Sequence, residues 1–168
     1  MTVSPWVARW VPLIEKGPHP VLDVASGRGR HTLYLLALGY QVVAVDRESA
    51  GPEVVRADLE ADPWPFPGQL FAGIVVTNYL HRPLFSVLAA ALAPRGVLIY
   101  ETFAEGQEAY GRPTNPDFLL RPDELLHAFP ELSVIAFEQG LASGPAVVQR
   151  LCAWRGAAGQ SPLLGEST

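Results

Sequence analysis

The sequence predicts an α/β fold: a doubly wound, mostly parallel sheet that closes with a C-terminal antiparallel hairpin, with one crossover helix reduced or missing. Three observations predict it. Short apolar runs alternate with segments of helical periodicity over most of the chain, which is typical of strand and helix units that cover both faces of a sheet. A glycine-rich turn directly follows the first apolar run, as at the ligand-binding edge of such sheets. The last two apolar runs are separated only by a glycine-containing turn, which indicates a hairpin.

The first part of the chain predicts two helices and four strands. Residues 5–16 have apolar side chains at roughly helical spacing, so we expect a short helix that covers the sheet or a ligand. A second helix is expected over residues 29–38, with Gly39 as its C-cap. The expected strands span residues 21–25, 41–46, 53–57 and 71–77, and a proline-rich loop over 62–68 precedes the last of them.

One connection is too short for a standard crossover. Only residues 47–52 separate the second and third expected strands, whereas a parallel crossover takes about a dozen residues or more. We therefore expect the helix there to be missing, the third strand to be short, and one face of the sheet to be thinly covered. We hypothesise that a second copy of the chain buries that apolar face, so that the protein is a homodimer.

The second part of the chain predicts two further helices, a fifth strand and the hairpin. A helix over residues 83–92 is expected to stop at Pro94 and Gly96, ahead of a β-branched and aromatic strand over residues 97–103. Residues 104–121 form a polar loop, and loops of this length are usually functional or disordered. The remaining expected elements are a helix over 122–129, hairpin strands over 132–138 and 146–154, and a frayed tail over 155–168.

Length and composition fit one compact domain, which we place at residues 1–154. The chain has 17 acidic and 12 basic residues with no basic cluster, so it lacks the charge pattern of a general nucleic-acid binder, and a small-molecule partner is favoured. Cys152 lies in an apolar run and is expected to be a core residue, with no metal-ligand spacing elsewhere. No secretion signal or membrane span is indicated, which favours the cytoplasm.

The turn after the first strand has features that suit a nucleotide cofactor. Residues 21–32 read VLDVASGRGRHT. Glycines 27 and 29 let the backbone approach a ligand, and the free N–H groups of the following helix favour a carboxylate or phosphate. The glycine pair alone also fits simple loop geometry. Asp46 strengthens the cofactor interpretation because it ends the second strand, 23 residues after Asp23, where an acid can bind ribose hydroxyls.

The same turn distinguishes between dinucleotides and S-adenosylmethionine, which share this plan. A dinucleotide turn reads GxGxxG or GxGxxA, whereas this chain has Thr32 at the third small position, which weakens a pyrophosphate site. Asp23, Ala25, Gly27 and Gly29 form D-x-A-x-G-x-G, which resembles the first motif of class I S-adenosylmethionine-dependent methyltransferases. The order of elements from residue 21 to 154, with its terminal hairpin, resembles the same family.

The resemblance implies a Rossmann-like methyltransferase fold and roles for the cofactor residues. Asp23 would orient the turn or reach the methionine amino group, and Asp46 would hold the two ribose hydroxyls. Asp58 and Leu59 match the positions that bind adenine in this family, although Asp58 can also be a solvated loop acid. The other residues expected to contact the cofactor are Ala25, Gly27, Gly29, Arg30, Arg47 and Asn78.

The residues after the fourth strand match a segment that, in this family, faces both the cofactor and the methyl acceptor. Tyr79 and His81 are the candidate general bases, although an activated methyl group makes a base optional. Each of these residues also has a structural interpretation. Asn78 and Tyr79 can simply form the turn, and His81 can have a structural role. Arg82 and Arg112 can clamp an anionic acceptor or form surface ion pairs.

A closer resemblance covers residues 27–47. They are similar to the corresponding segment of the tellurite-resistance group of methyltransferases and its uncharacterised bacterial relatives, and the matching residues are Arg30, Leu33, Tyr34, Leu35, Gly39 and Tyr40. The segment is one β–α–β unit and assigns no acceptor. In such proteins the segment at residues 111–125 forms a lid over the acceptor. Tyr110, Arg112, Asn115 and Phe118 are therefore candidates for substrate contact, beside Arg82 from the segment after the fourth strand, and a purely structural loop is the alternative.

The leading hypothesis is the transfer of a methyl group from S-adenosylmethionine to a small-molecule acceptor. One alternative is a non-catalytic S-adenosylmethionine-binding or regulatory protein, which the missing crossover helix favours. A dinucleotide-dependent oxidoreductase is a further alternative, disfavoured by Thr32 and by the terminal hairpin.

Overall fold

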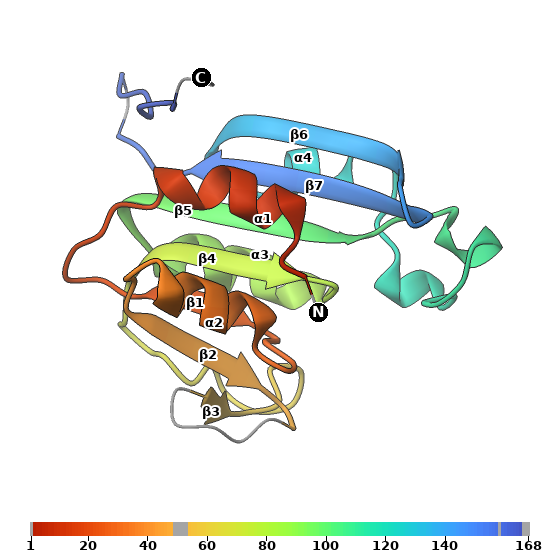
Figure 1. Cartoon of the computed structure of the whole chain (residues 1–168), viewed down its shortest axis with the longest axis horizontal. Helices are drawn as coiled ribbons and strands as arrows, with labels where there is room; N and C mark the ends of the chain where they lie inside the picture. Colours follow the sequence, from red (N-terminus) through yellow and green to blue (C-terminus); the bar gives the residue numbers. More distant parts are fainter. Residues whose placement is uncertain (1, 49–53, 158, 166–168) are drawn as a thin grey trace.

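The computed structural model describes residues 2–48, 54–157 and 159–165. Among these residues a seven-stranded sheet has the order β3-β2-β1-β4-β5-β7-β6 (Figure 1). The strands β1 to β5 pair in parallel, and β7 is antiparallel to both β5 and β6. The predicted doubly wound, mostly parallel sheet with a terminal antiparallel hairpin is therefore confirmed.

The elements have the following bounds. The strands are β1 (Val21–Val24), β2 (Val42–Asp46), β3 (Val54–Arg56), β4 (Phe71–Thr77), β5 (Leu92–Phe103), β6 (Ser133–Ala142) and β7 (Ala146–Trp154). The α-helices are α1 (Pro5–Trp10), α2 (Arg30–Ala37), α3 (Phe85–Ala91) and α4 (Glu124–Ala128). The short 3-10 helices are η1 (Val11–Leu13), η2 (Arg82–Leu84), η3 (Gln107–Ala109) and η4 (Pro116–Phe118). None of the helices in the described parts of the chain is both long and apolar enough to span a bilayer.

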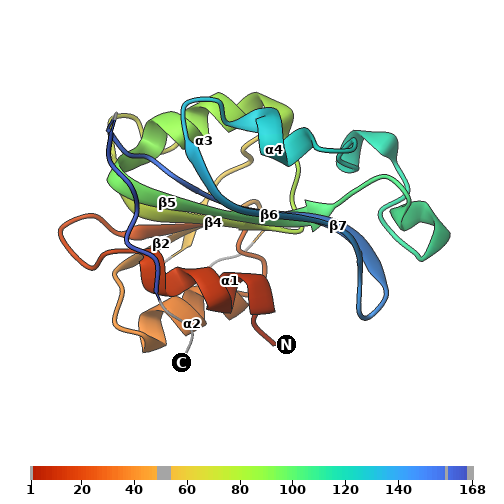
Figure 2. The same cartoon turned by 90° about the horizontal axis from the view of Figure 1, so that it is seen from above.

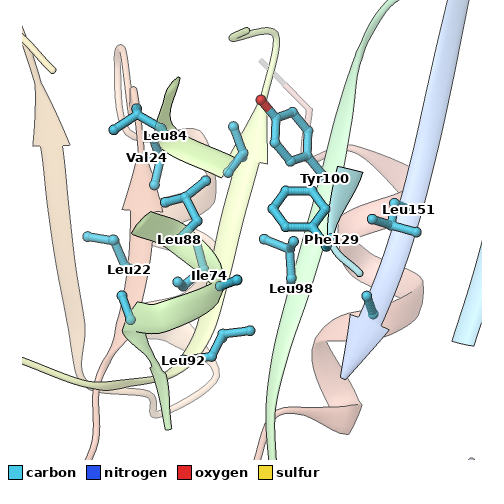
Figure 3. Close-up of a cluster of buried hydrophobic side chains, with 14 of the residues drawn as sticks. Leu22, Val24, Ile74, Leu84, Leu88, Leu92, Leu98, Tyr100, Phe129 and Leu151 are labelled. Carbon is cyan, nitrogen blue, oxygen red and sulfur yellow. The ribbon is translucent and has the colours of Figure 1, made fainter. Parts of the chain in front are cut away.

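Helices cover the sheet on both faces, with α1 and α2 on one side and α3 and α4 on the other (Figure 2). Successive strand residues point to opposite faces. Leu98 and Tyr100 therefore pack with the α3 side, whereas Ile99 packs with the α1 side. The α3 side holds the larger cluster, in which the rings of Tyr100 and Phe129 lie beside each other (Figure 3). Two buried faces explain why the strands read as nearly continuous apolar runs.

The parallel strands end at one edge of the sheet, and this edge positions the candidate site. Val24 of β1 is level with Val45 of β2 and Val76 of β4. The arrows of β2, β4 and β5 point to the same edge, which also carries the loop of residues 104–121 (Figure 1). The loops after β1, β2, β3 and β4 therefore come together there, where ligands bind in open α/β sheets.

The start of β5 differs from the prediction. The expected helix over 83–92 is a 3-10 turn followed by α3, and the strand begins at Leu92 rather than at residue 97. Leu92 pairs with Phe71 and Val97 pairs with Gly73, so the register shifts between these pairs. Pro94 lies inside this irregular stretch, which tolerates proline because the regular ladder of hydrogen bonds is interrupted there.

The bounds of other helices and strands also differ from the prediction. The expected helix over 5–16 is α1 followed by a 3-10 turn that contains Pro12, and the expected helix over 122–129 begins only at Glu124, because Asp123 has a left-handed backbone with φ of 61°. β6 runs to Ala142 instead of 138, since its partner β7 pairs with it along this mostly exposed extension. Arg155, expected in the frayed tail, donates its N–H to Gly96 O at 2.9 Å, so it is part of the sheet margin.

The third strand is short, as expected, with three residues. The connection expected to lack a helix includes residues 49–53, which lie outside the described residues. After β3, the proline-rich loop covers the sheet in place of a helix. The ring of Phe66 packs at 5.5 Å from Phe71 and at 5.3 Å from Trp64, so aromatic side chains fill part of the space that a crossover helix would occupy.

Candidate functional site

The turn after β1 has an unusual backbone. Ala25 has a φ of 52° and Gly27 a φ of 56°, in the left-handed region that costs energy for a residue with a side chain. Such outliers occur mainly at functional sites. No heavy atom lies within 4 Å of the position that a Cβ on Gly27 would take. The turn therefore presents open backbone at the edge of the sheet.

Asp46 joins this turn to the end of β2 through hydrogen bonds. Its Oδ2 accepts a hydrogen bond from Gly27 N at 2.8 Å, and its Oδ1 accepts one from Glu48 N at 2.9 Å. Ser26 N also donates to Val45 O at 3.1 Å. These bonds hold the Asp46 carboxylate beside the glycine turn and orient it by two backbone donors.

Asp46 and the turn line a first cavity of about 420 Å³. The loops that follow β1, β2, β3 and β4 all contribute to it, together with the end of η4. Among the described residues of its lining, four side chains are carboxylates and one is a guanidinium, and the remainder are mainly apolar. The lining residues are Ala25, Gly27, Val45, Asp46, Arg47, Glu48, Ala57, Asp58, Leu59, Glu60, Tyr79 and Phe118.

The loop after β3 supplies the acidic side of this cavity. Asp58 Oδ1 accepts a hydrogen bond from Glu60 N at 3.0 Å, and Asp58 N donates to Asp62 Oδ2 at 2.8 Å. These bonds form a compact turn that places Asp58, Leu59 and Glu60 on the cavity wall. An acid followed by an apolar residue thus lies on the cavity wall, and the binding of adenine by this pair stays a prediction.

A second cavity, of about 470 Å³, lies next to the first. Glu60, Tyr79 and Phe118 line both cavities, so these residues form the junction between them. The full lining of the second cavity is Glu60, Asn78, Tyr79, Leu80, Thr102, Phe103, Arg112, Pro113 and Phe118. Two adjoining cavities can hold two ligands with their reacting atoms close together.

Tyr79 lies at this junction in its protonated form. Burial raises the pKa of its phenol to about 12, and the nearby carboxylates of Glu60 and Asp58 add to the effect. A phenol with this pKa stays neutral near pH 7, so it can donate a hydrogen bond or pack against a ligand. This argues against the expected role of Tyr79 as a general base.

His81 lies behind the junction. Its Nδ1 is 3.4 Å from Glu60 Oε1, and it lines neither cavity. Glu60, and not His81, is therefore the residue of this pair that lines the cavities. Glu60 was missed in the sequence because an acid in a polar loop carries no distinctive pattern, and only the fold brings it between two cavities.

Three of the expected cofactor residues shape the turn without lining either cavity. Asp23 is buried, and its Oδ2 accepts a hydrogen bond from Thr32 Oγ1 at 2.7 Å. Burial raises the pKa of Asp23 to about 6, although the bond from Thr32 opposes the shift. Gly29 caps α2, and Arg30 Nη1 donates to Thr2 O at 3.0 Å. Of the two roles expected for Asp23, the structure favours orientation of the turn.

The candidate substrate residues divide into two groups. Arg112 lines the second cavity, and Phe118 lines both cavities. Arg82 instead forms a two-pronged ion pair with Glu124, at 2.7 and 2.9 Å, and donates to Leu119 O at 2.9 Å. Its planar donors are used within the protein, so it supports the loop and does not face an acceptor.

Two further candidates from the same loop also lie outside the cavities. Tyr110 is 49% exposed and lines neither of them. Asn115 Oδ1 accepts a hydrogen bond from Asp117 N at 2.9 Å and thereby caps η4. Asn115 thus positions the helix that carries Phe118. Residues that sequence reasoning missed in the second cavity are Leu80, Thr102, Phe103 and Pro113.

The N-terminal segment is tied to the start of α2 beside the glycine turn. Ser4 N donates to His31 Nε2 at 3.1 Å, and Ser4 Oγ donates to Glu101 Oε1 at 2.7 Å. Burial lowers the pKa of His31 to about 4, so the ring is neutral at pH 7. The helix expected to cover the sheet or a ligand therefore covers the sheet, and Trp6 Nε1 donates to Leu151 O at 3.1 Å.

The sheet order and the superposition on solved structures show the fold of class I S-adenosylmethionine-dependent methyltransferases. Residues 9–61 match the sequence model of the family described as tellurite resistance protein TehB. The predicted resemblance to the tellurite-resistance methyltransferases is confirmed over this segment, which includes the glycine turn and Asp46. No curated protein sequence matches the chain.

Solved structures with this fold differ in what they do. TehB from Haemophilus influenzae superposes with a TM-score of 0.71 at 16% identity, over 91% of this chain and 62% of that chain. A 1,6-didemethyltoxoflavin N1-methyltransferase from Burkholderia thailandensis, solved with S-adenosylhomocysteine, gives 0.63 at 18% identity, over 90% and 76%. The [4+2]-cyclase SpnF gives 0.65 at 13% identity, over 91% and 79%. The fold is thus shared by enzymes of more than one reaction type.

Proposed function

We propose that this protein transfers a methyl group from S-adenosylmethionine to a small-molecule acceptor. The observation that carries the proposal is the pair of adjoining cavities at the carboxyl edge of the sheet. The first contains Asp46 beside the glycine turn and the Asp58–Leu59 pair, as the family motif requires, and the second shares Glu60, Tyr79 and Phe118 with it. One cavity is thereby suited to the cofactor and the other to the acceptor.

The residues of the first cavity fit S-adenosylmethionine. Asp46 would accept hydrogen bonds from the ribose hydroxyls, Asp58 would accept one from the adenine amino group, and Leu59 would present its N–H to a ring nitrogen. Ala25 and Gly27 would lie along the methionine part. Arg47 lines the same cavity, where its guanidinium lies 3.4 Å from Glu48 Oε1, and we propose that it exchanges this exposed pair for the carboxylate of the cofactor.

Charge distinguishes this cofactor from a dinucleotide. Asp46, Glu48, Asp58 and Glu60 line the first cavity, and Arg47 is the only cationic side chain among the lining residues that the structure describes. S-adenosylmethionine carries a sulfonium and an ammonium against one carboxylate, whereas a dinucleotide carries a doubly negative pyrophosphate. An acidic cavity attracts the first ligand and repels the second. This agrees with the absence of the third small residue at Thr32.

The main task of the protein in this reaction is to position the acceptor. When bound, S-adenosylmethionine supplies a methyl group that its sulfonium already activates. The chain's own residues then hold the acceptor in line and exclude water. Tyr79 and Phe118 form the wall at the junction, and the protonated Tyr79 hydroxyl can donate a hydrogen bond there. His81 is proposed to act through Glu60, with which it is paired.

Calorimetric titration of the whole chain tests the proposal. We expect S-adenosylmethionine and S-adenosylhomocysteine to bind and NADH to give no heat of binding. Incubation with a panel of small acceptors should then release S-adenosylhomocysteine. Binding without turnover across a broad panel would favour the non-catalytic alternative, and binding of NADH instead would replace the proposal with the oxidoreductase.

We propose further that residues 1–154 form a single methyltransferase domain that works in the cytoplasm as a homodimer, independently of nucleic acid or membranes. The dimer is supported by exposed apolar side chains in this part of the fold, which are Leu36 on α2, Leu38 at the C-cap of α2 and Val55 on β3. Burying such side chains in a self-complementary interface stabilises a symmetric dimer. Sedimentation that gives a monomer at working concentration contradicts this assembly.

A further inference from the structure

The second cavity combines apolar walls with two opposite charges. Glu60 also lines the first cavity, so its carboxylate lies at the junction, whereas Arg112 lines only the second cavity. Asn78 and Thr102 are the uncharged polar contributors. The apolar walls come from Tyr79, Leu80, Phe103, Pro113 and Phe118. A ligand that fits must therefore be largely apolar and must tolerate a carboxylate on the side nearest the cofactor.

This lining is unsuited to an inorganic oxyanion. Small oxyanions are bound by several cationic or N–H donors, usually converging on one point. Here Arg112 is the only cationic side chain among the described residues of the lining, and Glu60 would repel an anion at the junction. Arg82, two residues after the lining residue Leu80, is held by Glu124 and does not line the cavity. A volume of about 470 Å³ is instead ordinary for an organic ligand.

We infer that the acceptor is a small aromatic or otherwise apolar organic acid that carries a protic nucleophile, such as a hydroxyl, thiol or amino group. The inference rests on the proposed function and names its substrate class. Phe103, Phe118 and Tyr79 provide the surface for an aromatic ring. Arg112 binds the acid group, and Glu60 accepts a hydrogen bond from the nucleophile, which turns it toward the first cavity.

Two of the residues that would make these contacts are positioned by their neighbours. The backbone N–H of Glu60 donates to Asp58 Oδ1 at 3.0 Å, and its carboxylate lies 3.4 Å from His81 Nδ1. Phe118 ends η4, which Asn115 caps. Fixed side chains cost less entropy on binding than mobile ones, so these contacts are suited to selecting a ligand.

Ligand-observed NMR titrations of the cofactor-free protein test the inference with four probes. The probes are 4-hydroxybenzoate, benzoate, 4-methylphenol and sodium tellurite. We expect 4-hydroxybenzoate to bind best. Benzoate lacks the hydroxyl and 4-methylphenol lacks the acid, so each should bind about tenfold more weakly, which is the typical effect of one hydrogen bond to a charged group. Sodium tellurite should not displace 4-hydroxybenzoate.

Variants connect each preference to a residue. Glu60→Gln should abolish the preference for 4-hydroxybenzoate over benzoate, and Arg112→Gln should abolish the preference over 4-methylphenol. Arg121→Gln is the matched control for Arg112, because it lies in the same loop and lines neither cavity. Tyr110→Ala is the matched control for Phe118→Ala. The two residues are similarly exposed, Tyr110 at 49% and Phe118 at 45%, and of the two only Phe118 lines the cavities.

The outcomes separate this inference from the proposed function. Preferences that survive both Glu60→Gln and Arg112→Gln, or displacement of 4-hydroxybenzoate by tellurite, overturn the inference even if S-adenosylmethionine binds in calorimetry. Conversely, if the probes respond as expected but S-adenosylmethionine fails to bind, the proposed function fails and the ligand chemistry of the cavity stands. Arg112→Gln should leave cofactor affinity unchanged, because Arg112 lines only the second cavity.

Discussion

Replacing Asp46 tests the cofactor site most directly. Its carboxylate is oriented by backbone donors from Gly27 and Glu48 and lines the first cavity. A hydrogen bond to a charged group is worth about 1.5–3 kcal/mol, so Asp46→Ala should weaken the binding of S-adenosylhomocysteine by about 10- to 100-fold. Asp46→Asn keeps the size of the side chain but places an amide where two N–H donors converge, so a similar loss is expected.

The assay must separate binding from folding. Calorimetry gives the dissociation constant, and urea denaturation of the same variants shows whether the turn after β1 is still folded. Glu131→Gln is the control, because Glu131 is an exposed acid that lines neither cavity, and it should bind like the wild type.

A comparison of two ligands isolates the sugar contact. The wild type should prefer S-adenosylhomocysteine to its 2′-deoxy analogue, and Asp46→Asn should reduce that preference, since the carboxylate that receives the hydroxyl is gone. A folded Asp46→Asn variant with unchanged affinity, or an unchanged preference between the two ligands, refutes the assignment of Asp46 to the ribose.

Three further predictions concern two buried ionisable groups, the ion pair of Arg82, and Tyr79 at the junction of the two cavities. In the wild type, Asp23 lowers stability as the pH rises from about 4 to 6, because its pKa is raised to about 6 in the folded state, while His31, with its pKa lowered to about 4, raises stability over the same range. In Asp23→Asn only the second effect remains, so the free energy of unfolding should rise more steeply with pH; superimposable urea profiles would contradict this. Arg82→Gln should lower the free energy of unfolding by about 1–3 kcal/mol by leaving Glu124 unpaired, with cofactor affinity unchanged in calorimetry; a loss of affinity without a loss of stability would return Arg82 to the site. Tyr79→Phe should leave the pH dependence of methyl transfer between pH 6 and 9 unchanged, because the phenol with a pKa of about 12 does not titrate there; disappearance of an ionisation from the rate profile would restore Tyr79 as a base.

Some parts of the fold could be predicted because their signals are local. The runs at β1, β2 and β4 are apolar on both faces, and the glycine turn and Asp46 follow directly in sequence. The beginning of β5 could not be predicted in the same way. Pro94 and Gly96 indicate a break, and only the register against Phe71 and Gly73 shows that the break is an irregularity within the strand.

Some residues of the candidate site could likewise be predicted from local signals in the sequence, and others could not. Asp46, Asp58 and Leu59 belong to motifs with a recognisable order, and the structure brings them to one cavity. In the sequence, Arg82 and Arg112 were equal candidates for binding an anionic acceptor. The ion pair that removes Arg82 from the site joins it to Glu124, which lies 42 positions away in the chain. Sequence spacing carries no information about which of two arginines has its donors already used.

The amino-acid sequence alone determined the class of fold, the glycine turn after β1 and the acid at the end of β2, because apolar periodicity, glycine freedom and the order of polar residues act between neighbours in the chain. Tertiary structure decided that Glu60, Tyr79 and Phe118 line both cavities, and that the second cavity is apolar with one charge of each sign among its described residues. The physical reason is that a cavity is the space left between side chains from separate loops, and its shape and charge exist only once the sheet has brought those loops to a common edge.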